Sequence, residues 1–203
     1  MSERPENQQY FTSQPAAESA PRQVKWRLPD MLVVVWTDRG VFSKGKVDRG
    51  TDLLARAMEL PAEGEILDLG AGYGPLGIVA ARRYPGARVT LVEVNERAAA
   101  LAQRNLALNG VNKAEVIVGD APEVLGERQF DAVLFNPPMH AGKAVVMRLV
   151  ADARARLRPG GSLWFVAQTK QGAKTLARDV AEMFAVVEER EIRGGFRVYQ
   201  ATA

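Results

Sequence analysis

The 203-residue chain has no cysteine and a single histidine, His140. Without thiols it can form neither disulfide bonds nor thiolate metal sites, and it lacks the cysteine nucleophile that enzymes methylating carbon-5 of pyrimidines commonly need. One histidine gives little basis for a histidine-ligated metal site, so we expect no metal. No apolar stretch is long enough to span a membrane and no secretory signal pattern opens the chain, so we expect a cytoplasmic protein.

The composition is that of an ordinary globular protein, with 47% hydrophobic and 25% charged residues. The length suits one sizeable domain with a full hydrophobic core. The formal net charge of +3 and the pI near 9.3 lean basic, which is compatible with a polyanionic partner but does not require one. The sequence leaves the oligomeric state open, with a monomer favoured.

The first 50 residues differ in character from the rest of the chain. Residues 1–23 are rich in Ser, Pro, Gln, Ala and Glu without an apolar period, which is typical of an arm that is flexible or wraps the surface. Runs rich in β-formers at 24–28 and 31–37 flank a Pro-Asp pair and predict a hairpin, and a glycine-punctuated loop follows. We therefore expect an arm at residues 1–23, a hairpin with the glycine-punctuated loop at 24–50, and a main domain at 51–203.

From residue 52 onwards, predicted helices and strands alternate. Helices are expected at 52–60, 75–83, 97–109, 144–157 and 173–184, and strands at 66–69, 88–93, 114–118, 130–135, 162–167, 185–190 and 196–201. This alternation predicts an α/β fold, a doubly wound, mostly parallel seven-stranded sheet with helices on both faces. Because only residues 191–195 separate the last two strands, we expect these two strands to pair antiparallel. The last strand is then the antiparallel member of the mostly parallel sheet.

A glycine-rich loop follows the first strand of this alternation. Gly70, Gly72 and Gly74 lie between that strand and the next helix, at the sheet edge where ligands bind in this architecture. Glycines let a ligand approach the backbone closely, and the start of the helix adds N–H donors. Glu93 ends the following strand, where a carboxylate can accept from both hydroxyls of a ribose. These features fit a nicotinamide dinucleotide as well as an S-adenosyl cofactor.

Polar residues at the other strand ends favour the S-adenosyl cofactor. Asp68 precedes the first glycine by two residues and can meet the cationic amino group of a methionyl moiety. Asp120, after the third of these strands, can accept from an adenine amine, and Asn136 follows the fourth. Singly, Asp68 also suits a turn and Asp120 the cap of a short helix. Polar signals at four successive strand ends favour one shared binding site.

The fourth strand runs into Asn136-Pro137-Pro138, which organises the predicted site. The prolines fix their own φ angles and extend the residues before them, so the chain leaves the sheet in a rigid elbow. Because prolines lack N–H groups, the elbow presents mainly acceptors: the Asn136 amide oxygen and the carbonyls of Asn136 and Pro137. Two acceptors can hold the N–H bonds of a planar amine and direct its lone pair at an electrophile. Taken alone, the tripeptide is also a common way to end a strand.

Four motifs stand in a recognisable order: Asp-Leu-Gly-Ala-Gly-Tyr-Gly at 68–74, Val-Glu-Val-Asn at 92–95, Gly-Asp-Ala at 119–121 and Asn-Pro-Pro at 136–138. This order resembles the S-adenosylmethionine-dependent class I methyltransferases. More narrowly, Gly-Val-Phe-Ser at 40–43 and the histidine after the elbow resemble the branch of ribosomal-RNA guanine-N2 methyltransferases and their single-domain relatives. The resemblance covers nearly the whole chain. It implies a Rossmann-like methyltransferase catalytic domain over residues 51–203, with S-adenosyl-L-methionine as cofactor.

The motifs and the resemblance together indicate the residues of the site. The expected cofactor-binding residues are Phe42, Asp48, Thr51, Asp68, Gly70, Ala71, Gly72, Gly74, Glu93, Val94, Asp120, Ala121 and Asn136. The expected catalytic residues are Asn136, Pro137, Pro138, Met139 and His140. The branch usually has Phe or Tyr where Met139 stands, a ring expected to stack on the target base, whereas methionine offers an apolar face without a π-system. His140 is either the acceptor of the departing proton or a plain loop residue, and Asp48 either lies over the cofactor or caps a helix.

We expect direct methyl transfer to an exocyclic amine of a nucleobase, with guanine N2 in ribosomal RNA favoured. The target base has to be unpaired or flipped out to reach the elbow. Adenine-N6 methylation of nucleic acid, methylation of a protein glutamine amide, and an S-adenosylmethionine-binding module without catalysis stay open as alternatives. Basic residues around the expected mouth can hold RNA phosphates: Lys44, Lys46, Arg49, Lys143, Arg148, Lys170, Arg193 and Arg197.

Overall fold

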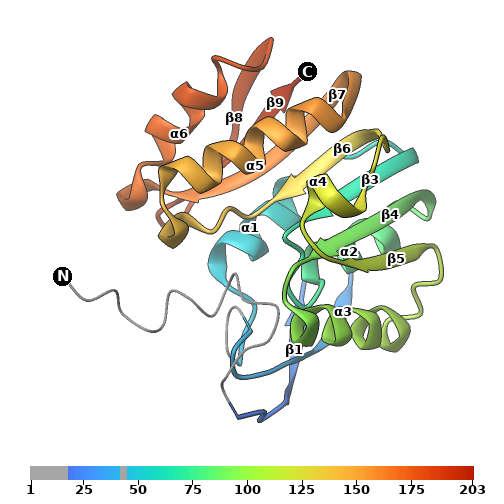
Figure 1. Ribbon diagram of the computed structural model, residues 1–203. Helices are drawn as coiled ribbons and strands as arrows, with labels where there is room; N and C mark the ends of the chain where they lie inside the picture. Colours follow the sequence, from blue (N-terminus) through green and yellow to red (C-terminus); the bar gives the residue numbers. More distant parts are fainter. Residues whose placement is uncertain (1–17, 42–44) are drawn as a thin grey trace.

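A seven-stranded sheet runs through the computed structural model, which describes residues 18–41 and 45–203 (Figure 1). Its strands are β3 (Glu63–Leu69), β4 (Gly86–Glu93), β5 (Ala114–Val118), β6 (Phe130–Phe135), β7 (Leu157–Gln168), β8 (Val186–Arg193) and β9 (Phe196–Thr202). They lie in the order β5-β4-β3-β6-β7-β9-β8, with β9 antiparallel to both of its neighbours. The predicted α/β fold with a mostly parallel sheet and an antiparallel last strand is confirmed. Most of the predicted arm, residues 1–17, lies outside the described residues.

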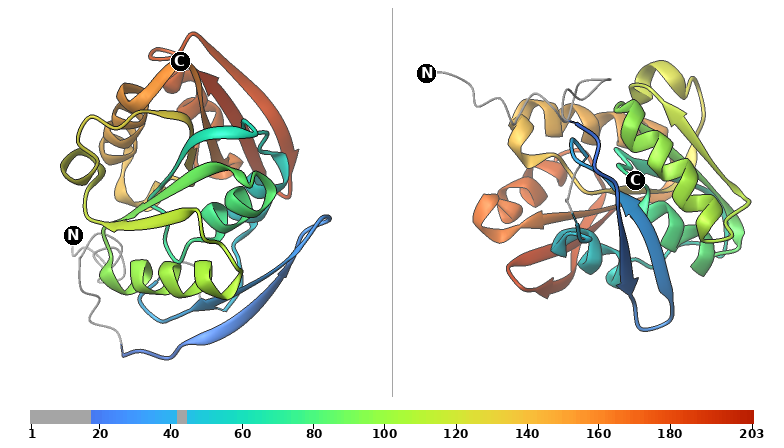
Figure 2. Two further views of the ribbon diagram at one scale, coloured as in Figure 1. Left: turned by 90° about the vertical axis from the view of Figure 1, so that its right-hand side faces the viewer. Right: turned by 90° about the horizontal axis from the view of Figure 1, so that it is seen from below.

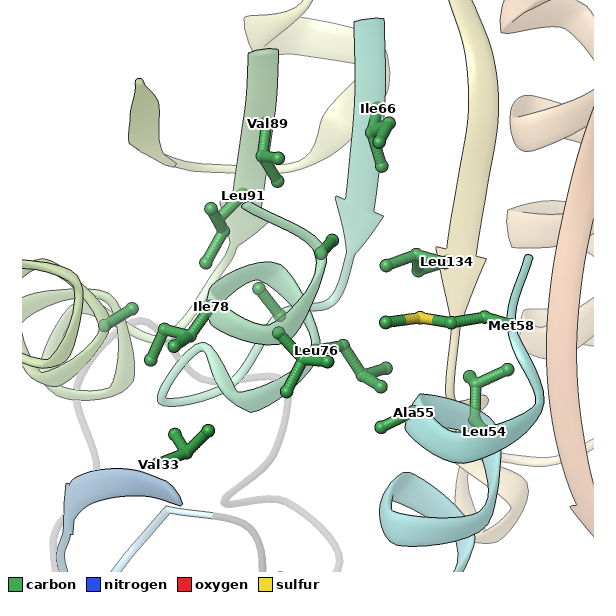
Figure 3. Packing of buried hydrophobic residues seen from close by; sticks show 14 of the residues in the cluster. Val33, Leu54, Ala55, Met58, Ile66, Leu76, Ile78, Val89, Leu91 and Leu134 are labelled. Atoms are coloured by element: carbon green, nitrogen blue, oxygen red, sulfur yellow. The ribbon is translucent and has the colours of Figure 1, made fainter. Parts of the chain in front are cut away.

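Helices cover both faces of the sheet, so each face has its own hydrophobic core. The core on one face lies under α1 (Arg49–Ala57), α2 (Pro75–Arg83) and α3 (Glu96–Leu108), and the other lies under α5 (Lys143–Arg156) and α6 (Ala173–Val180). Side chains alternate between the two along β6, where Leu134 enters the first core and Phe135 the second. Figure 3 shows the first core, in which Met58 lies next to Leu134. Because both faces are covered, the central strands read as continuous apolar runs.

Some element ends differ from the prediction because caps and turns decide them. α1 begins at Arg49, not at residue 52, since the Asp48 carboxylate accepts from the backbone N–H groups of Gly50 (2.9 Å) and Thr51 (3.0 Å). β8 extends to Arg193, so only two glycines at 194–195 connect it to β9. Both have positive φ, as a tight two-residue hairpin turn requires. Within the described residues, no helix is long and apolar enough to cross a membrane.

The predicted hairpin is present as β1 (Arg22–Arg27) and β2 (Leu32–Thr37), paired antiparallel. It lies along α3 on the outside of the sheet domain (Figure 2). Trp26 and Val33 of the hairpin are buried in the same core as α2 and α3. The hairpin is thus packed onto the face of the domain that also carries the loop after β3.

Two asparagines at the C-terminal end of α3 bind the free edge of β2, since their side-chain amides pair with its backbone groups as a neighbouring strand would. Asn105 accepts from the Trp36 N–H at 2.7 Å and donates to the Trp36 carbonyl at 2.9 Å. Asn109 accepts from the Val34 N–H at 3.1 Å and donates to the Val34 carbonyl at 2.7 Å. The two asparagines are four residues apart on the helix, and their partners Trp36 and Val34 are two residues apart on the strand. These separations match, because four helical residues rise about 6 Å and two strand residues about 6.6 Å. Asn105 also donates to the Tyr73 carbonyl at 2.9 Å, which ties the hairpin to the loop after β3.

We predict that Asn105→Ala strongly destabilises the fold. Asn105 is fully buried, and its loss leaves the buried Tyr73 carbonyl and the partly buried backbone groups of Trp36 without this partner. Each buried polar group left unsatisfied costs about 1–3 kcal/mol. Urea unfolding should therefore show a clearly smaller free energy of unfolding. The control Gln103→Ala, exposed on the same helix, should stay within about 0.5 kcal/mol of the unchanged protein. Equal unfolding midpoints for the two variants would contradict the prediction.

Candidate active site

A pocket of about 400 Å³ opens at the carboxyl ends of β3, β4, β5 and β6. Its wall includes most of the predicted site residues: Asp48, Thr51, Asp68, Gly70, Ala71, Gly72, Glu93, Val94, Asp120, Ala121, Asn136, Pro137 and Pro138. Gly74, Met139 and His140 do not belong to the wall, and Phe42 lies outside the described residues. A larger hollow of about 840 Å³ lies near the amino ends of β4 and β5 and contains no predicted site residue. The structure thus brings residues from five separate segments to one pocket.

The loop after β3 turns sharply at Gly70, Gly72 and Gly74, whose φ angles are 68°, 59° and 85°. A Cβ atom added to Gly70 or Gly72 would meet no described atom within 4 Å. Open space therefore adjoins the backbone at these two residues. Gly74 instead serves packing, since a Cβ there would lie 3.1 Å from Leu91 and 3.2 Å from Ala102.

Two buried carboxylates flank this loop. Glu93 accepts from the Gly72 N–H at 2.7 Å and the Asn95 N–H at 2.9 Å, so it ties together the loops after β3 and β4. Asp68, only 1% exposed, accepts from the Gly77 N–H at 2.8 Å. Burial, aided by the charge of Glu93 and opposed by the Gly77 N–H, raises the pKa of Asp68 to about 7. Burial also raises the pKa of Glu93. A cationic ligand beside this pair would favour the ionised form of both carboxyl groups.

Asp120 stands at the N-cap position of the short helix α4 (Ala121–Val124), but its side chain does not cap the helix. Its carboxylate accepts from the Arg148 guanidinium of α5 at 2.9 Å, and both residues line the pocket. The nearly buried Arg156 fixes α4 in place by donating to the carbonyls of Ala121 at 3.1 Å and Gly126 at 2.8 Å. Asp120 is therefore held at the pocket by two arginines of α5, one of which contacts it directly.

The elbow after β6 forms the next part of the wall. Pro138 has φ −75° and ψ 75°, and in this tight turn the Met139 N–H donates to the Pro137 carbonyl at 2.9 Å. That carbonyl retains a second lone pair. The elbow continues into the 3₁₀ turn η2 (Met139–Ala141), where Met139 packs against the second core and His140 is exposed. Of the elbow, Asn136 and the two prolines reach the pocket.

The front segment meets the elbow across the pocket. The Asn136 Nδ2 donates to the Thr51 Oγ1 at 2.9 Å and lies 3.5 Å from the Asp48 Oδ2. Asp48 caps α1, and it also lines the pocket. Sequence reasoning missed the contact between these segments because 85 positions separate Thr51 from Asn136. It also missed Asn95 of the wall, although an asparagine directly before a helix is a recognisable cap.

The basic residues expected around the mouth have different surroundings. Lys143 pairs with Asp179 at 2.6 Å, and Arg197 pairs with Glu189. Exposed cations at the same edge of the sheet include Arg49, Lys170 and Arg193, whereas Lys44 lies outside the described residues.

The chain is similar to known proteins over most of its length. The profile of the family described as methyltransferase small domain matches residues 32–200. The uncharacterized protein YbxB of Bacillus subtilis is 34% identical over 197 residues, which cover 96% of this chain and 98% of that protein. Ribosomal RNA small subunit methyltransferase C of Pseudomonas putida is 35% identical over 189 residues, which cover 91% of this chain and 55% of that enzyme.

Among solved structures, the T. thermophilus 16S rRNA N2 methyltransferase RsmC, in complex with AdoMet and guanosine, superposes with a TM-score of 0.80. It is 32% identical, and the match covers 93% of this chain and 52% of that one. The chain thus spans about half the length of its relatives named methyltransferase C, and nearly the full length of YbxB.

Proposed function

Because the chain belongs to the methyltransferase small-domain family, we propose that its pocket binds S-adenosylmethionine and that it methylates the exocyclic N2 of a guanine in ribosomal RNA. The observation that carries the proposal is the acceptor-rich elbow, which lies on the wall of the same pocket as Asp68, Glu93 and Asp120. The likeness to ribosomal-RNA methyltransferases over most of the chain supports RNA as the substrate.

The described residues fit an S-adenosyl cofactor. Open space beside Gly70 and Gly72 admits a ligand close to the backbone. Asp68 offers a buried carboxylate to the cationic amino group, Glu93 offers one to the ribose hydroxyls, and Asp120 offers an acceptor to the adenine amine. When bound, the cofactor supplies an electrophilic methyl group. Because the elbow lines the same pocket, we expect it to hold the substrate amine beside that methyl group.

The chain promotes the transfer by positioning and electrostatics. An exocyclic amine is a poor nucleophile because its lone pair is delocalised into the ring. Acceptors at the Asn136 amide oxygen and the Pro137 carbonyl favour the pyramidal nitrogen and stabilise its developing positive charge. The elbow contains no carboxylate, so the proton leaves after transfer, with the exposed His140 as a nearby acceptor. We expect Arg49, which is exposed and follows the pocket residue Asp48, to hold a phosphate of the incoming strand.

We predict that cofactor affinity depends on pH through Asp68. Burial raises the pKa of the Asp68 carboxyl from its ordinary 3.8 to about 7. The protonated carboxyl therefore stabilises the folded state fully below pH 3.8, and this stabilisation is lost as the pH rises through 7. A cationic ligand prefers the ionised form, so its affinity should rise as pH increases from 5.5 to 7, by up to about tenfold per pH unit. Calorimetry with S-adenosylhomocysteine should show this trend, and Asp68→Asn should abolish it. An equally steep trend in Asp68→Asn would contradict the assignment.

RNA from cells lacking the gene tests the proposed substrate. Nucleosides from digested ribosomal RNA would be compared by mass spectrometry with those of the parent strain and of a strain carrying the gene on a plasmid. We expect the amount of N2-methylguanosine to fall and to return with the plasmid. Loss of N6-methyladenosine, or of a methylated protein glutamine with unchanged RNA, would assign the elbow to another amine. Unchanged RNA and protein would favour a binding module without catalysis.

A further inference from the structure

We propose that Thr51, oriented by Asp48, is a positioning residue that turns the amide oxygen of Asn136 toward the substrate amine. The inference rests on the proposed function, since it concerns how the elbow receives an NH₂ group. It gives Thr51 a role different from the predicted contact with the cofactor. It also gives the front segment a direct part in the geometry of transfer.

The argument begins with the hydroxyl of Thr51. Thr51 is 3% exposed, and its hydroxyl donates its single hydrogen to the Asp48 carboxylate. The same carboxylate accepts from the backbone N–H groups of Gly50 and Thr51 at the start of α1. A hydroxyl has one hydrogen and two lone pairs, so toward any further neighbour Thr51 is an acceptor only.

Asn136 is that neighbour. Its Nδ2 donates to the Thr51 Oγ1 at 2.9 Å and approaches the Asp48 Oδ2 at 3.5 Å. The opposite orientation of the amide would set the Asn136 Oδ1 against the lone pairs of a hydroxyl and a carboxylate. The direction of the chain of hydrogen bonds therefore fixes which end of the amide faces Thr51. The oxygen is left for the pocket, and within residues 18–41 and 45–203 no group donates to it.

The orienting groups stand on a rigid element. Asp48 caps α1, and the first turn of that helix packs closely against β9, since a Cβ on Gly50 would lie 3.3 Å from the Phe196 ring. The same Cβ would lie 3.1 Å from the Asp48 Oδ1, so a side chain at residue 50 would force the cap or the Phe196 ring to shift by a few tenths of an ångström. A catalytic acceptor held by a helix cap is placed more accurately than one held by a loop.

The test compares Thr51→Val with Thr51→Ser. Valine keeps the shape but can neither donate nor accept, whereas serine keeps the hydroxyl. With saturating RNA and cofactor, Thr51→Val should lower kcat on the order of 10- to 100-fold, as loss of an orienting group typically does. Thr51→Ser should restore most of the rate. Cofactor affinity, measured by calorimetry, should change less than about twofold in both. Thr90→Val, which removes a buried hydroxyl at the other end of the sheet, is the matched control and should keep the wild-type kcat.

A double-mutant cycle separates positioning from an independent role. If Thr51 acts through Asn136, adding Thr51→Val to Asn136→Ala should cost nothing further. Full additivity, or a loss of cofactor affinity in Thr51→Val that matches its loss of rate, would overturn the proposal. A wild-type kcat in Thr51→Val would overturn it as well.

A measurement without substrate keeps this proposal separate from the proposed function. The side-chain amide signals of Asn136, identified by their absence from Asn136→Ala, can be followed by ¹⁵N NMR in the free protein. They should shift in Thr51→Val and stay in place in Thr90→Val. Unmoved signals would refute the orienting contact. Shifted signals together with a different methylated product would sink the proposed substrate and leave the orienting contact standing.

Discussion

Asn136→Ala should abolish methyl transfer while leaving cofactor affinity nearly unchanged. The Asn136 amide bonds to Thr51 and approaches Asp48, whereas the carboxylates assigned to the cofactor belong to other strand ends. Its oxygen is needed when the substrate nitrogen becomes pyramidal, so its loss affects the transition state. Losing one preorganised group of this kind typically costs on the order of 10²–10³ in rate. Single-turnover methylation of RNA measures the rate, and calorimetry with S-adenosylhomocysteine measures the affinity.

The control for this substitution is Asn112→Ala, an exposed asparagine that lines the hollow at the other end of the sheet. It should match the wild-type protein in rate and affinity. An Asn136→Ala protein with full activity on its RNA would mean that the elbow is only a turn. A fall in cofactor affinity as large as the fall in rate would mean that Asn136 holds the cofactor, not the amine.

Glu93→Ala should weaken cofactor binding more than any other single substitution in the pocket. Glu93 is 8% exposed and holds the Gly72 and Asn95 N–H groups, so it shapes two loops of the wall. A carboxylate that also accepts from two ribose hydroxyls makes two charge-assisted bonds, each worth about 1.5–3 kcal/mol. Losing both should raise the Kd for S-adenosylhomocysteine roughly 10²- to 10⁴-fold.

Two further variants sharpen the test of Glu93. Glu93→Gln keeps one acceptor oxygen and should lose less affinity than Glu93→Ala. Glu96→Ala, exposed in the first turn of α3, should bind as the wild-type protein does. A Kd for Glu93→Ala within twofold of the wild-type value, with an unchanged thermal midpoint, would remove Glu93 from the cofactor site.

The fold could be predicted where one physical signal dominates. The helix at 75–83 and the strands at 114–118 and 130–135 are found with the predicted ends. In these segments proline, glycine and continuous apolar runs leave few alternatives. Most of the predicted site residues lie at one pocket for a related reason: the carboxyl ends of parallel strands share an edge of the sheet.

The features that could not be predicted depend on long-range partners. Asn105 and Asn109 look like ordinary helix residues until β2 lies beside them, because their hydrogen bonds go to a strand about 70 positions away. The contact of Asn136 with Thr51 arises in the same way. The end of β8 was placed too early, since the sequence does not show how far its charged residues continue to pair with β9.

The most direct test of the account is the identity of the methylated nucleoside. Purified protein would be incubated with unmodified ribosomal RNA, free and in small subunits, and with S-adenosylmethionine carrying a deuterated methyl group. The RNA would then be digested and its nucleosides separated by mass spectrometry, with Asn136→Ala as the parallel control. The account predicts deuterated N2-methylguanosine with the unchanged protein and on the order of 10²- to 10³-fold less with the variant. Label in another nucleoside, or equal label with both proteins, would contradict it.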